Sequence, residues 1–331
     1  QAPGSDPGNT PPAAPPGVPQ MTAEDLSAFL DGIIPQQLDR ENIAGATVSV
    51  VKDGKLLFAK GYGYSDVEAK APVSPEKTLF RPGSVSKLFT WTAVMQMQEQ
   101  GKLDLDRDVN EYIDFKIPDA FGKPITTRHL LTHTPGFEEQ IKDLFSTEPT
   151  TDLGGYLKTH IPTRIFPPGT TPAYSNYGTA LAGYIVERIS GVPFTQYVDD
   201  NILKPLGMVN SSFAQPLPDH LAANMSKGYR LASDKPLDFE MVSAFPAGSM
   251  SSSAADMANF MLAHLQEGKL GEASILKPET TKLMHERLFG LDPAAPGMAH
   301  GFYEEPQNGM RIIGHGGDTQ WFHSDLQLFP D

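Results

Sequence analysis

Hydrophobic and polar residues alternate along the chain in two places, one near each end. Residues 46–51 and 55–60 alternate in this way on either side of Asp53-Gly54. A two-residue Asp-Gly connection between alternating runs is typical of a β-hairpin. Residues 310–314 and 322–329 also alternate and favour strand. We therefore predict β-strands at both ends of the chain.

Between these strands, apolar residues recur at the period of an α-helix. The run from Ser84 to Gln100 has apolar residues around most of its circumference, so we predict a central, buried helix there. Another helix should begin after Thr22, whose side chain can cap its N-terminus. Further helices are expected at residues 127–132, 179–190, 194–203 and 253–267.

The order of these elements predicts a fold of the mixed α/β (α+β) class. The strands at both ends would form an antiparallel sheet flanked by helices, built from residues 21–80 and 245–331. Residues 81–244 would form an inserted, mostly helical domain. Residues 1–20 are mainly Pro, Gly, Ala and small polar residues with a single charge, so we predict a disordered spacer there.

The composition excludes several kinds of chemistry. The 331 residues include no cysteine, which excludes disulfides, thiolate metal sites and cysteine nucleophiles. The nine histidines are scattered and lack the spacing of a zinc protease, so we expect no metal and no cofactor. Lysine and arginine number 26 against 40 Asp and Glu, a net charge of −14, and no basic run occurs. We therefore expect no nucleic-acid partner.

The sequence also bears on where the protein acts. No window approaches 18 consecutive apolar residues, so we expect no membrane span in this chain. The chain starts at Gln1 without an initiator Met or an apolar signal segment. We interpret it as an exported protein, periplasmic or extracellular, whose signal peptide has been removed.

A Ser-x-x-Lys motif, Ser84 to Lys87, opens the predicted central helix. One helical turn separates the two residues, so the lysine amine can reach the serine hydroxyl. The motif also occurs at Ser74 and Ser274, but neither serine opens a long buried helix, and Pro278 disfavours helix at the second. The pattern favours a reactive serine served by the lysine amine. The alternative is a helix-capping serine beside a lysine that reaches water.

Tyr174-Ser175-Asn176 is the second candidate constellation. It follows a stiff Pro-Pro-Gly loop and precedes the helix predicted at residues 179–190. A tyrosine acts as a base near pH 7 only where positive charges favour phenolate, and Lys87 could supply part of that charge. The amide of Asn176 suits gripping a substrate amide or orienting the lysine. A surface aromatic is the alternative for the tyrosine.

His315-Gly316-Gly317 is the third candidate, expected at the turn between the last two strands. Two glycines let the backbone approach a ligand closely, and the N–H groups of Asp318 and Ser84 could form an oxyanion hole. If His315 faces the site, repulsion from Lys87 lowers its pKa. Substrates with a carboxylate should then be favoured more near pH 5–6 than at pH 7–8. The alternative is an ordinary hairpin turn with a solvent-facing histidine.

In this order, the three motifs resemble the serine β-lactamase and penicillin-recognising enzyme superfamily. The resemblance is to its class C branch, which includes DD-peptidases, D-aminopeptidases and esterases of the same fold. It extends over about residues 21–331, and connecting segments at residues 80–90, 129–136, 168–169 and 204–208 are similar to that branch.

The resemblance implies a role for each motif. Ser84 would be the nucleophile, Lys87 its proton partner, and Tyr174 the base and leaving-group acid. His133 would be structural. The substrate-binding residues that the resemblance implies are Asn176, His315, Gly316, Gly317 and Asp318.

Two features depart from the pattern of that superfamily. Where β-lactamases have Lys-Thr-Gly, this chain has His315-Gly316-Gly317, so recognition of a substrate carboxylate should weaken. A histidine there is similar to some DD-peptidases and D-aminopeptidases, and the related esterases tolerate the loss of both groups. The chain also ends at Asp331, whereas family members continue through a further strand and helix. We expect either a cut chain or another segment that completes the domain.

We therefore expect a serine hydrolase that forms an acyl-enzyme on an ester or amide carbonyl, of the β-lactamase-fold esterase or D-amino-acid peptidase type. A true β-lactamase or DD-carboxypeptidase is the alternative among enzymes. The alternative of another class is a catalytically silent protein that binds peptidoglycan or another partner. The expected partner is a small ester, a β-lactam or a D-amino-acid peptide, with peptidoglycan as a further candidate.

Overall fold

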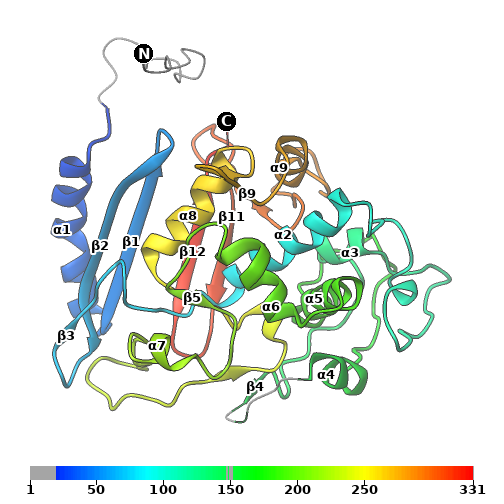
Figure 1. Ribbon diagram of the computed structural model, residues 1–331, viewed down its shortest axis with the longest axis horizontal. Coiled ribbons are helices and arrows are strands. Elements are labelled where there is room, and N and C mark those ends of the chain that lie inside the picture. Colours follow the sequence, from blue (N-terminus) through cyan, green and yellow to red (C-terminus); the bar gives the residue numbers. More distant parts are fainter. Residues whose placement is uncertain (1–19, 147, 149–151, 331) are drawn as a thin grey trace, which may run out of the picture.

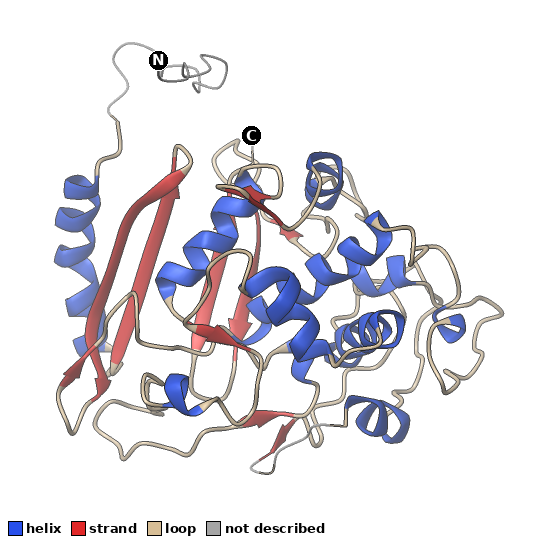
Figure 2. Cartoon of the chain, in the orientation of Figure 1, coloured by secondary structure: helices blue, strands red, loops and turns tan. Residues whose placement is uncertain are grey.

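The structure, a computed structural model, describes residues 20–146, 148 and 152–330. The spacer predicted at residues 1–20 therefore lies, apart from Gln20, outside the described residues. The described chain begins with a helix, Ala23–Arg40. Strands follow this helix and also end the described chain, and the other helices lie between these two sets of strands, as Figure 1 and Figure 2 show. This arrangement confirms the predicted mixed class of helix and antiparallel sheet.

The N-terminal elements form a helix and a hairpin. Helix α1, Ala23–Arg40, begins where the Thr22 side chain accepts a hydrogen bond from the Asp25 N–H at 3.1 Å. Strands β1, Gly45–Lys52, and β2, Lys55–Asp66, pair antiparallel, and the short β3, Ala71–Pro72, pairs with β2. Asp53 and Gly54 both have positive φ, as the predicted two-residue turn requires.

The C-terminal strands form a second antiparallel sheet in the order β10-β11-β12: Tyr303–Glu304, Ile313–Asp318 and His323–Leu328. The turn predicted at Gly316-Gly317 is wrong, because both glycines lie inside β11 and the connection to β12 follows Asp318. A Cβ atom at Gly317 would lie 2.0 Å from the Pro82 carbonyl oxygen. Glycine is therefore needed there for close packing of a strand, and turn propensity misled the prediction.

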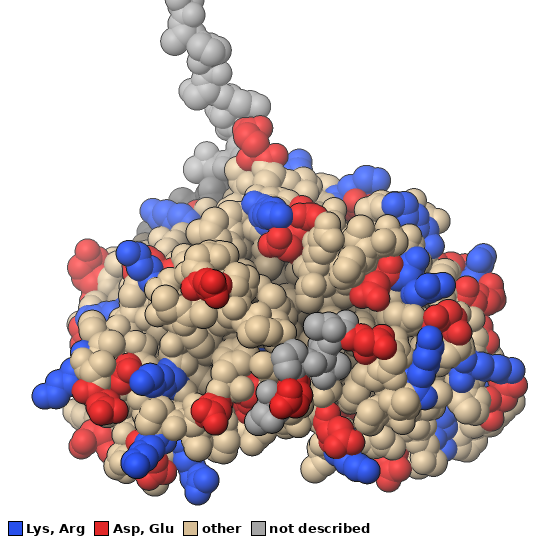
Figure 3. Space-filling model, turned by 60° about the horizontal axis from the view of Figure 1, so that its bottom comes forward, with Lys and Arg blue, Asp and Glu red and all other residues tan. Residues whose placement is uncertain are grey.

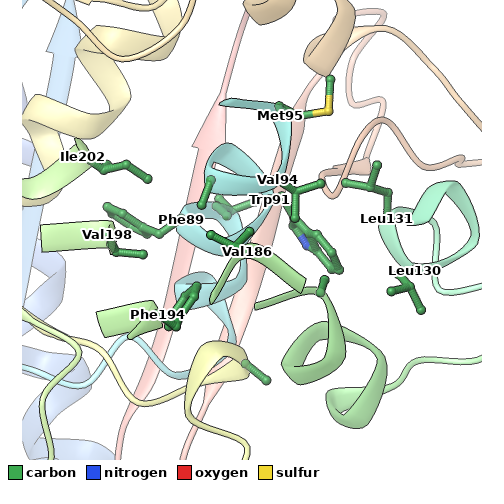
Figure 4. Close-up of a cluster of buried hydrophobic side chains, with 14 of the residues drawn as sticks. Phe89, Trp91, Val94, Met95, Leu130, Leu131, Val186, Phe194, Val198 and Ile202 are labelled. Carbon is green, nitrogen blue, oxygen red and sulfur yellow. The ribbon is translucent and has the colours of Figure 1, made fainter. Parts of the chain in front are cut away.

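Helix α2, Ser86–Glu99, is the centre of the molecule and follows a short 3₁₀ helix, Gly83–Val85. Twelve of its fourteen residues are buried, which confirms the prediction of a buried helix. Helix α5, Asn176–Ser190, packs against α2 and starts three residues before the predicted position, because the Ser175 hydroxyl caps it through the Gly178 N–H at 2.9 Å. Figure 4 shows side chains of α2 among apolar side chains from α5, from α3, Thr127–Leu131, and from α6, Phe194–Val198.

The remaining elements surround this core. Helix α8, Ala254–Leu265, packs against β1 and β2, and the Ser253 hydroxyl caps it, whereas the helices at residues 153–159, 219–222 and 278–285 were not anticipated. The other helices are α3 Thr127–Leu131, α4 Leu153–Thr159, α6 Phe194–Val198 with the π-helix Asp199–Leu203, α7 Asp219–Ala222, α8 Ala254–Leu265 and α9 Pro278–His285. The short strand pairs are β4 Phe145–Ser146 with β6 Met241–Val242, β5 Ser211–Ser212 with β7 Ser251–Ser252, and β8 Lys269–Leu270 with β9 Ala273–Ser274.

The surface carries charged side chains of both signs. Figure 3 shows acidic and basic side chains interspersed on the face that it presents. Among the described residues, none of the helices combines the length and the apolar character that crossing a membrane requires.

Candidate active site

The backbone around Ser84 lies directly against strand β11. Gly83 has φ +51°, and a Cβ atom there would lie 2.7 Å from the Asp318 nitrogen. A Cβ atom at Gly317 would lie 2.9 Å from the Ser84 nitrogen. The two glycines thus allow the backbone of Ser84 to approach that of Asp318, where the sequence predicts an oxyanion hole. The Ser324 hydroxyl, which donates to the Pro82 carbonyl at 2.8 Å, joins β12 to the same place.

Lys87 is completely buried one turn after Ser84. Its Nζ donates to Ser84 Oγ at 3.0 Å, to Asn176 Oδ1 at 2.7 Å and to the Ala247 carbonyl at 2.8 Å. Burial lowers the pKa of Lys87 to about 7, although the carboxyl of Glu139 opposes this shift. An amine with such a pKa can exchange a proton with the serine near neutral pH.

Tyr174 contacts the other side of the same hydroxyl. Its phenol donates to Ser84 Oγ at 2.6 Å, and Lys87 Nζ lies 4.7 Å from the centre of its ring. Burial raises the pKa of Tyr174 well above its ordinary value, and the hydrogen bond with Ser84 only partly opposes this. The phenol therefore keeps its proton at neutral pH in the free protein, which differs from the phenolate considered above.

His133 supports the loop that carries the tyrosine. Its Nδ1 accepts a hydrogen bond from the Ser175 N–H at 3.2 Å, and its carbonyl accepts one from the Ala173 N–H. The imidazole lies 4.6 Å, ring centre to ring centre, from Tyr174. Burial, with Lys87 nearby, lowers the pKa of His133 well below its ordinary value. A neutral, inward-facing histidine that fixes a loop agrees with the structural role that the resemblance implies.

Asn176, the first residue of α5, connects Lys87 to a carboxylate that the sequence analysis missed. Its Oδ1 accepts from Lys87, while its Nδ2 donates to Glu139 Oε1 at 2.7 Å and its N–H to Glu139 Oε2 at 3.0 Å. Burial raises the pKa of Glu139, and the bonds from Asn176 oppose the shift. Glu139 lies 37 residues before Asn176, and only its position just after the segment 129–136 could have drawn attention to it.

His315 is buried in β11 and lines the cavity above Ser84. Its Nδ1 lies 2.5 Å from the Gly316 carbonyl oxygen, and since a carbonyl only accepts, Nδ1 carries the hydrogen. Its Nε2 is buried without a hydrogen-bond partner among the described residues. Burial, and then Lys87, lowers the pKa of His315 to about 4. The imidazole therefore stays neutral at pH 5–6, which contradicts the pH window expected from the sequence.

A cavity of about 540 Å³ connects these groups with solvent. The predicted residues that line it are Ser84, Tyr174, Asn176, His315, Gly316 and Asp318. Lys87 lies beneath it, and Gly317 packs against the chain before α2 instead of lining it. Phe145, Tyr303 and Glu305, which the sequence analysis did not single out, complete much of the wall. No group of three His, Asp or Glu side chains placed to hold a metal occurs in the described part of the chain.

Comparisons with known proteins identify relatives of this chain. A family model described as Beta-lactamase matches residues 5–331. Protein flp of Staphylococcus aureus strain N315 is 28% identical over 315 residues, which cover 91% of this chain and 60% of that protein. A protein named Beta-lactamase from Yersinia enterocolitica is 26% identical over 312 residues, covering 94% of this chain and 76% of that protein. The chain thus spans 60% of the length of its Staphylococcus aureus relative.

Solved structures share the fold. An octameric penicillin-binding protein homologue from Pyrococcus abyssi aligns with a TM-score of 0.78 and 27% identity, over 92% of this chain and 70% of that one. A class C beta-lactamase aligns with a TM-score of 0.76 and 22% identity, over 93% of this chain and 89% of that one. At that identity the second likeness shows the fold alone.

Proposed function

The chain belongs to the beta-lactamase family, and from this premise we propose that it is a serine hydrolase that forms an acyl-enzyme on Ser84. One observation carries the proposal. The Ser84 hydroxyl, at the edge of a cavity, is hydrogen-bonded to both Lys87 Nζ at 3.0 Å and the Tyr174 phenol at 2.6 Å. A nucleophile held by a base and an acid is the arrangement that acyl transfer requires.

Acylation begins with a proton transfer from the Ser84 hydroxyl to Lys87. The pKa of about 7 makes the neutral amine available at physiological pH, whereas the raised pKa of Tyr174 leaves no phenolate to act as the base. The freed Oγ attacks the carbonyl carbon, and the backbone N–H groups of Ser84 and Asp318 stabilise the oxyanion. In this scheme Lys87 is the base of acylation, and the base role implied by the resemblance passes from Tyr174 to Lys87.

The leaving group departs with the proton of the Tyr174 hydroxyl, and the Lys87 ammonium then returns a proton to the phenolate. Lys87 is neutral again at this point and can take a proton from the water that attacks the acyl-enzyme. The reaction therefore balances without a cofactor: one water is consumed, an acid and an alcohol or amine are released, and Ser84 is restored.

The lining of the cavity favours, as the substrate, an ester or the kind of amide that a D-amino-acid peptidase cleaves. A neutral His315 occupies the place where the resembling β-lactamases carry a lysine, so no permanent charge is available for a substrate carboxylate. A β-lactamase or DD-carboxypeptidase is the second candidate, which the relative named Beta-lactamase from Yersinia enterocolitica favours.

Covalent labelling tests the proposal. The protein is exposed separately to a fluorophosphonate and to a penicillin, and its intact mass is measured. We expect a single adduct, mapped to Ser84, with the fluorophosphonate. Ser84→Ala should abolish the adduct and Ser74→Ala, which changes the serine of another Ser-x-x-Lys motif, should keep it. A folded protein that forms no adduct would contradict the assignment.

A comparison of substrates separates the two candidates. Turnover of short acyl esters with little β-lactam hydrolysis supports the esterase or peptidase type. Rapid hydrolysis of a penicillin, with kcat/KM above that of the esters, supports the β-lactamase instead.

A further inference from the structure

A second cavity, of about 150 Å³, is separate from the cavity around Ser84 but adjoins it along the chain. Residues 318–320 line the first cavity, and the next two residues, Trp321 and Phe322, line the second. The segment before α2 is divided in the same way, because Ser84 lines the first cavity and Arg81 lines the second. The proposed function uses no group of the second lining, so what this cavity could bind is a separate question.

Arg81 is the buried cation in the wall of the second cavity, and it is only 1% exposed. Its Nη1 donates to the Glu240 carbonyl, and its Nη2 donates to Gln215 Oε1 and to the Ser249 carbonyl, both at 3.2 Å. A guanidinium has five N–H groups, so these three bonds leave two N–H groups free. One of them is the N–H of Nε, which is buried and has no hydrogen-bond partner among the described residues. A ligand oxygen would satisfy this otherwise costly donor.

The charge of Arg81 also lacks an ion-pair partner. Among the described residues, none of the Asp and Glu side chains forms an ion pair with it. Burial lowers the pKa of Arg81 to about 10, and the charge of Glu240 opposes this shift, so the guanidinium keeps its proton at neutral pH. A buried cation without a paired anion costs free energy. A carboxylate would supply both the opposite charge and the oxygen acceptor.

The other charged groups of the lining do not exclude an anion. Lys227 is exposed and pairs with Asp66 at 2.8 Å. Asp238 is exposed as well, so water and salt screen its charge. Glu240 is buried, and its two carboxylate oxygens accept the Gln320 N–H at 3.1 and 3.2 Å. The lining thus contains two cations and two carboxylates, and the buried guanidinium is the group among them with an unpartnered donor.

Much of the remaining wall is apolar and aromatic. The centre of the Phe239 ring lies 4.5 Å from Cζ of Arg81, and the side chains of Trp321 and Phe322 line the same cavity. Gly228 packs its backbone against the tryptophan, because a Cβ atom there would lie 3.1 Å from Trp321 Cβ. A cavity of this volume with apolar walls can hold a benzene ring.

We propose that the second cavity binds a small aromatic carboxylate, with the carboxylate at Arg81 and the ring against Phe239 and Trp321. The site is distinct from the cavity around Ser84, and its ligand undergoes no reaction there. The inference goes beyond the proposed function and does not depend on it, since binding is measured whether or not Ser84 is reactive.

Three probes test the inference in the full wild-type chain: benzoate, its neutral analogue benzamide, and acetate, which lacks the ring. The chain has two tryptophans, Trp321 in the cavity wall and Trp91 fully buried in α2, so two indole N–H signals in an NMR titration report on binding. We expect benzoate to shift the Trp321 signal with a Kd of about 1 mM and to leave the Trp91 signal unchanged.

Benzamide and acetate should each bind at least about tenfold more weakly than benzoate, because the first lacks the charge and the second lacks the apolar body. Equal binding of benzoate and benzamide would show that the guanidinium does not select a charge, and would overturn the inference. Equal binding of benzoate and acetate would overturn it too, since the aromatic wall would then contribute nothing.

Two variants that each remove one positive charge from the lining identify the cation. Arg81→Gln should weaken benzoate binding by about tenfold or more. Lys227→Gln is the matched control at the exposed lysine of the same lining and should leave the Kd within about twofold. The opposite order of effects would mean that benzoate binds at the surface, and the inference would be wrong.

Because the guanidinium also bonds to three acceptors of the chain, a further variant tests the site with Arg81 in place. Leu237 is a partly buried residue of the wall, and Leu237→Trp fills the cavity with a larger side chain. It adds a third indole signal and should abolish the shift of the Trp321 signal by benzoate. Unchanged binding in the folded variant would overturn the inference, and the comparison of the three probes needs no variant at all.

Backbone amide signals separate the two cavities. In the wild-type chain, benzoate should shift the signals of Met225 and Phe239, which line the second cavity, with the same midpoint as the Trp321 signal. The signals of Phe145 and Tyr303, which line the first cavity, should stay in place. Shifts confined to Phe145 and Tyr303 would place benzoate in the cavity around Ser84 and would contradict a second site.

Discussion

Two clusters of buried polar groups contact helix α2, and they differ in what lies next to them. At the start of α2, Lys87 bonds to Ser84 and Asn176. Farther along, the Thr92 hydroxyl lies 3.3 Å from His264 Nε2, and His264 Nδ1 lies 3.2 Å from His285 Nε2. The first cluster borders the 540 Å³ cavity. The second is packed against aromatic rings, among them Phe260 and Phe302.

The difference shows that burial and perturbed pKa values do not by themselves identify an active site. Burial lowers the pKa of both Lys87 and His264. Only the first cluster combines the proposed nucleophile with access for a substrate, whereas the groups of the second contact one another inside the core. Substitutions in the first cluster should therefore change rate, and substitutions in the second should change stability.

The largest effect is expected for Ser84→Ala. Loss of the proposed nucleophile should reduce kcat/KM by on the order of 10⁴-fold or more. The free energy of unfolding should change by no more than about 1 kcal/mol, because one hydroxyl is removed from a partly buried position. Ester hydrolysis and urea unfolding, measured on the same preparation, check both parts. Retained activity with Ser74 or Ser274 labelled would show that the site is elsewhere.

Lys87→Ala should have the next largest effect, a loss of about 10²- to 10⁴-fold in kcat/KM. The proposed base works as the neutral amine, so wild-type kcat/KM should rise with pH through about 7 and then level off. The other groups around Lys87 should not produce this rise of kcat/KM with pH. The pKa values of His133 and His315 lie below its midpoint, and the pKa of the Tyr174 phenol lies above it. A rise of kcat/KM with the same midpoint in Lys87→Ala would exclude Lys87 as the base.

The carboxyl of Glu139 faces Lys87 through Asn176 and raises the lysine pKa. Glu139→Gln should therefore move the midpoint of the rise of kcat/KM with pH to lower pH. Glu138→Gln, which makes the same charge change at the neighbouring exposed residue, is the control and should leave the midpoint in place. The profile of kcat/KM against pH, measured with the neutral phenyl ester of 2-methylpropanoic acid, separates the two variants. A midpoint that moves upward in Glu139→Gln would mean that the carboxyl does not act on Lys87.

Much of the fold could be predicted because its signals are local. The apolar circumference of residues 84–100 predicts a buried helix, and Asp53-Gly54 predicts a hairpin, without reference to distant parts of the chain. The strand at Gly316-Gly317 was mistaken for a turn because the reason for its glycines is the carbonyl of Pro82, more than two hundred residues away. Local propensity cannot report a contact of that kind.

The candidate site divides in the same way. The residues that resemble known motifs, Ser84, Lys87 and Tyr174, lie together in the structure. Glu139 and the carbonyl of Ala247 belong to no motif, and their contacts with the site span 37 and 160 residues. The pKa of His315 was expected to fall through repulsion by Lys87, but burial is the larger cause, and burial cannot be read from a turn-like tripeptide.

His264→Ala tests the second cluster. Removing this buried side chain, with its contacts to Thr92 and His285, should lower the free energy of unfolding by about 2–4 kcal/mol. The kcat/KM of the folded protein should stay within about twofold, because His264 does not line the cavity. His220→Ala, at an exposed histidine, is the control and should change neither. A large loss of activity at unchanged stability would mean that the two clusters are coupled.

The smallest effect is expected at His315, where a lysine would place a cation in the wall of the cavity. Two phenyl esters of similar size test this: the half-ester of methylmalonic acid, which carries a carboxylate, and the ester of 2-methylpropanoic acid, which carries a methyl there. Because the pKa of His315 is about 4, the wild-type protein should show a constant ratio of kcat/KM for the half-ester to kcat/KM for the neutral ester between about pH 5.5 and 8. His315→Lys should raise this ratio by up to about fivefold, because one partly exposed ion pair contributes at most about 1 kcal/mol. Burial and Lys87 also disfavour a second ammonium, so the gain should be largest at the acidic end of the range.

His323→Lys provides the matched control for that change. It adds the same charge at an exposed position next to Asp318, outside the wall of the cavity, and should alter the ratio by less than about twofold because solvent screens it. If both lysine variants raise the ratio equally, the substrate responds to the general field of the rim and His315 does not face it. If only His315→Lys raises the ratio, the acyl group contacts the wall of the cavity at β11. The first cluster then differs from the second because its groups contact the substrate.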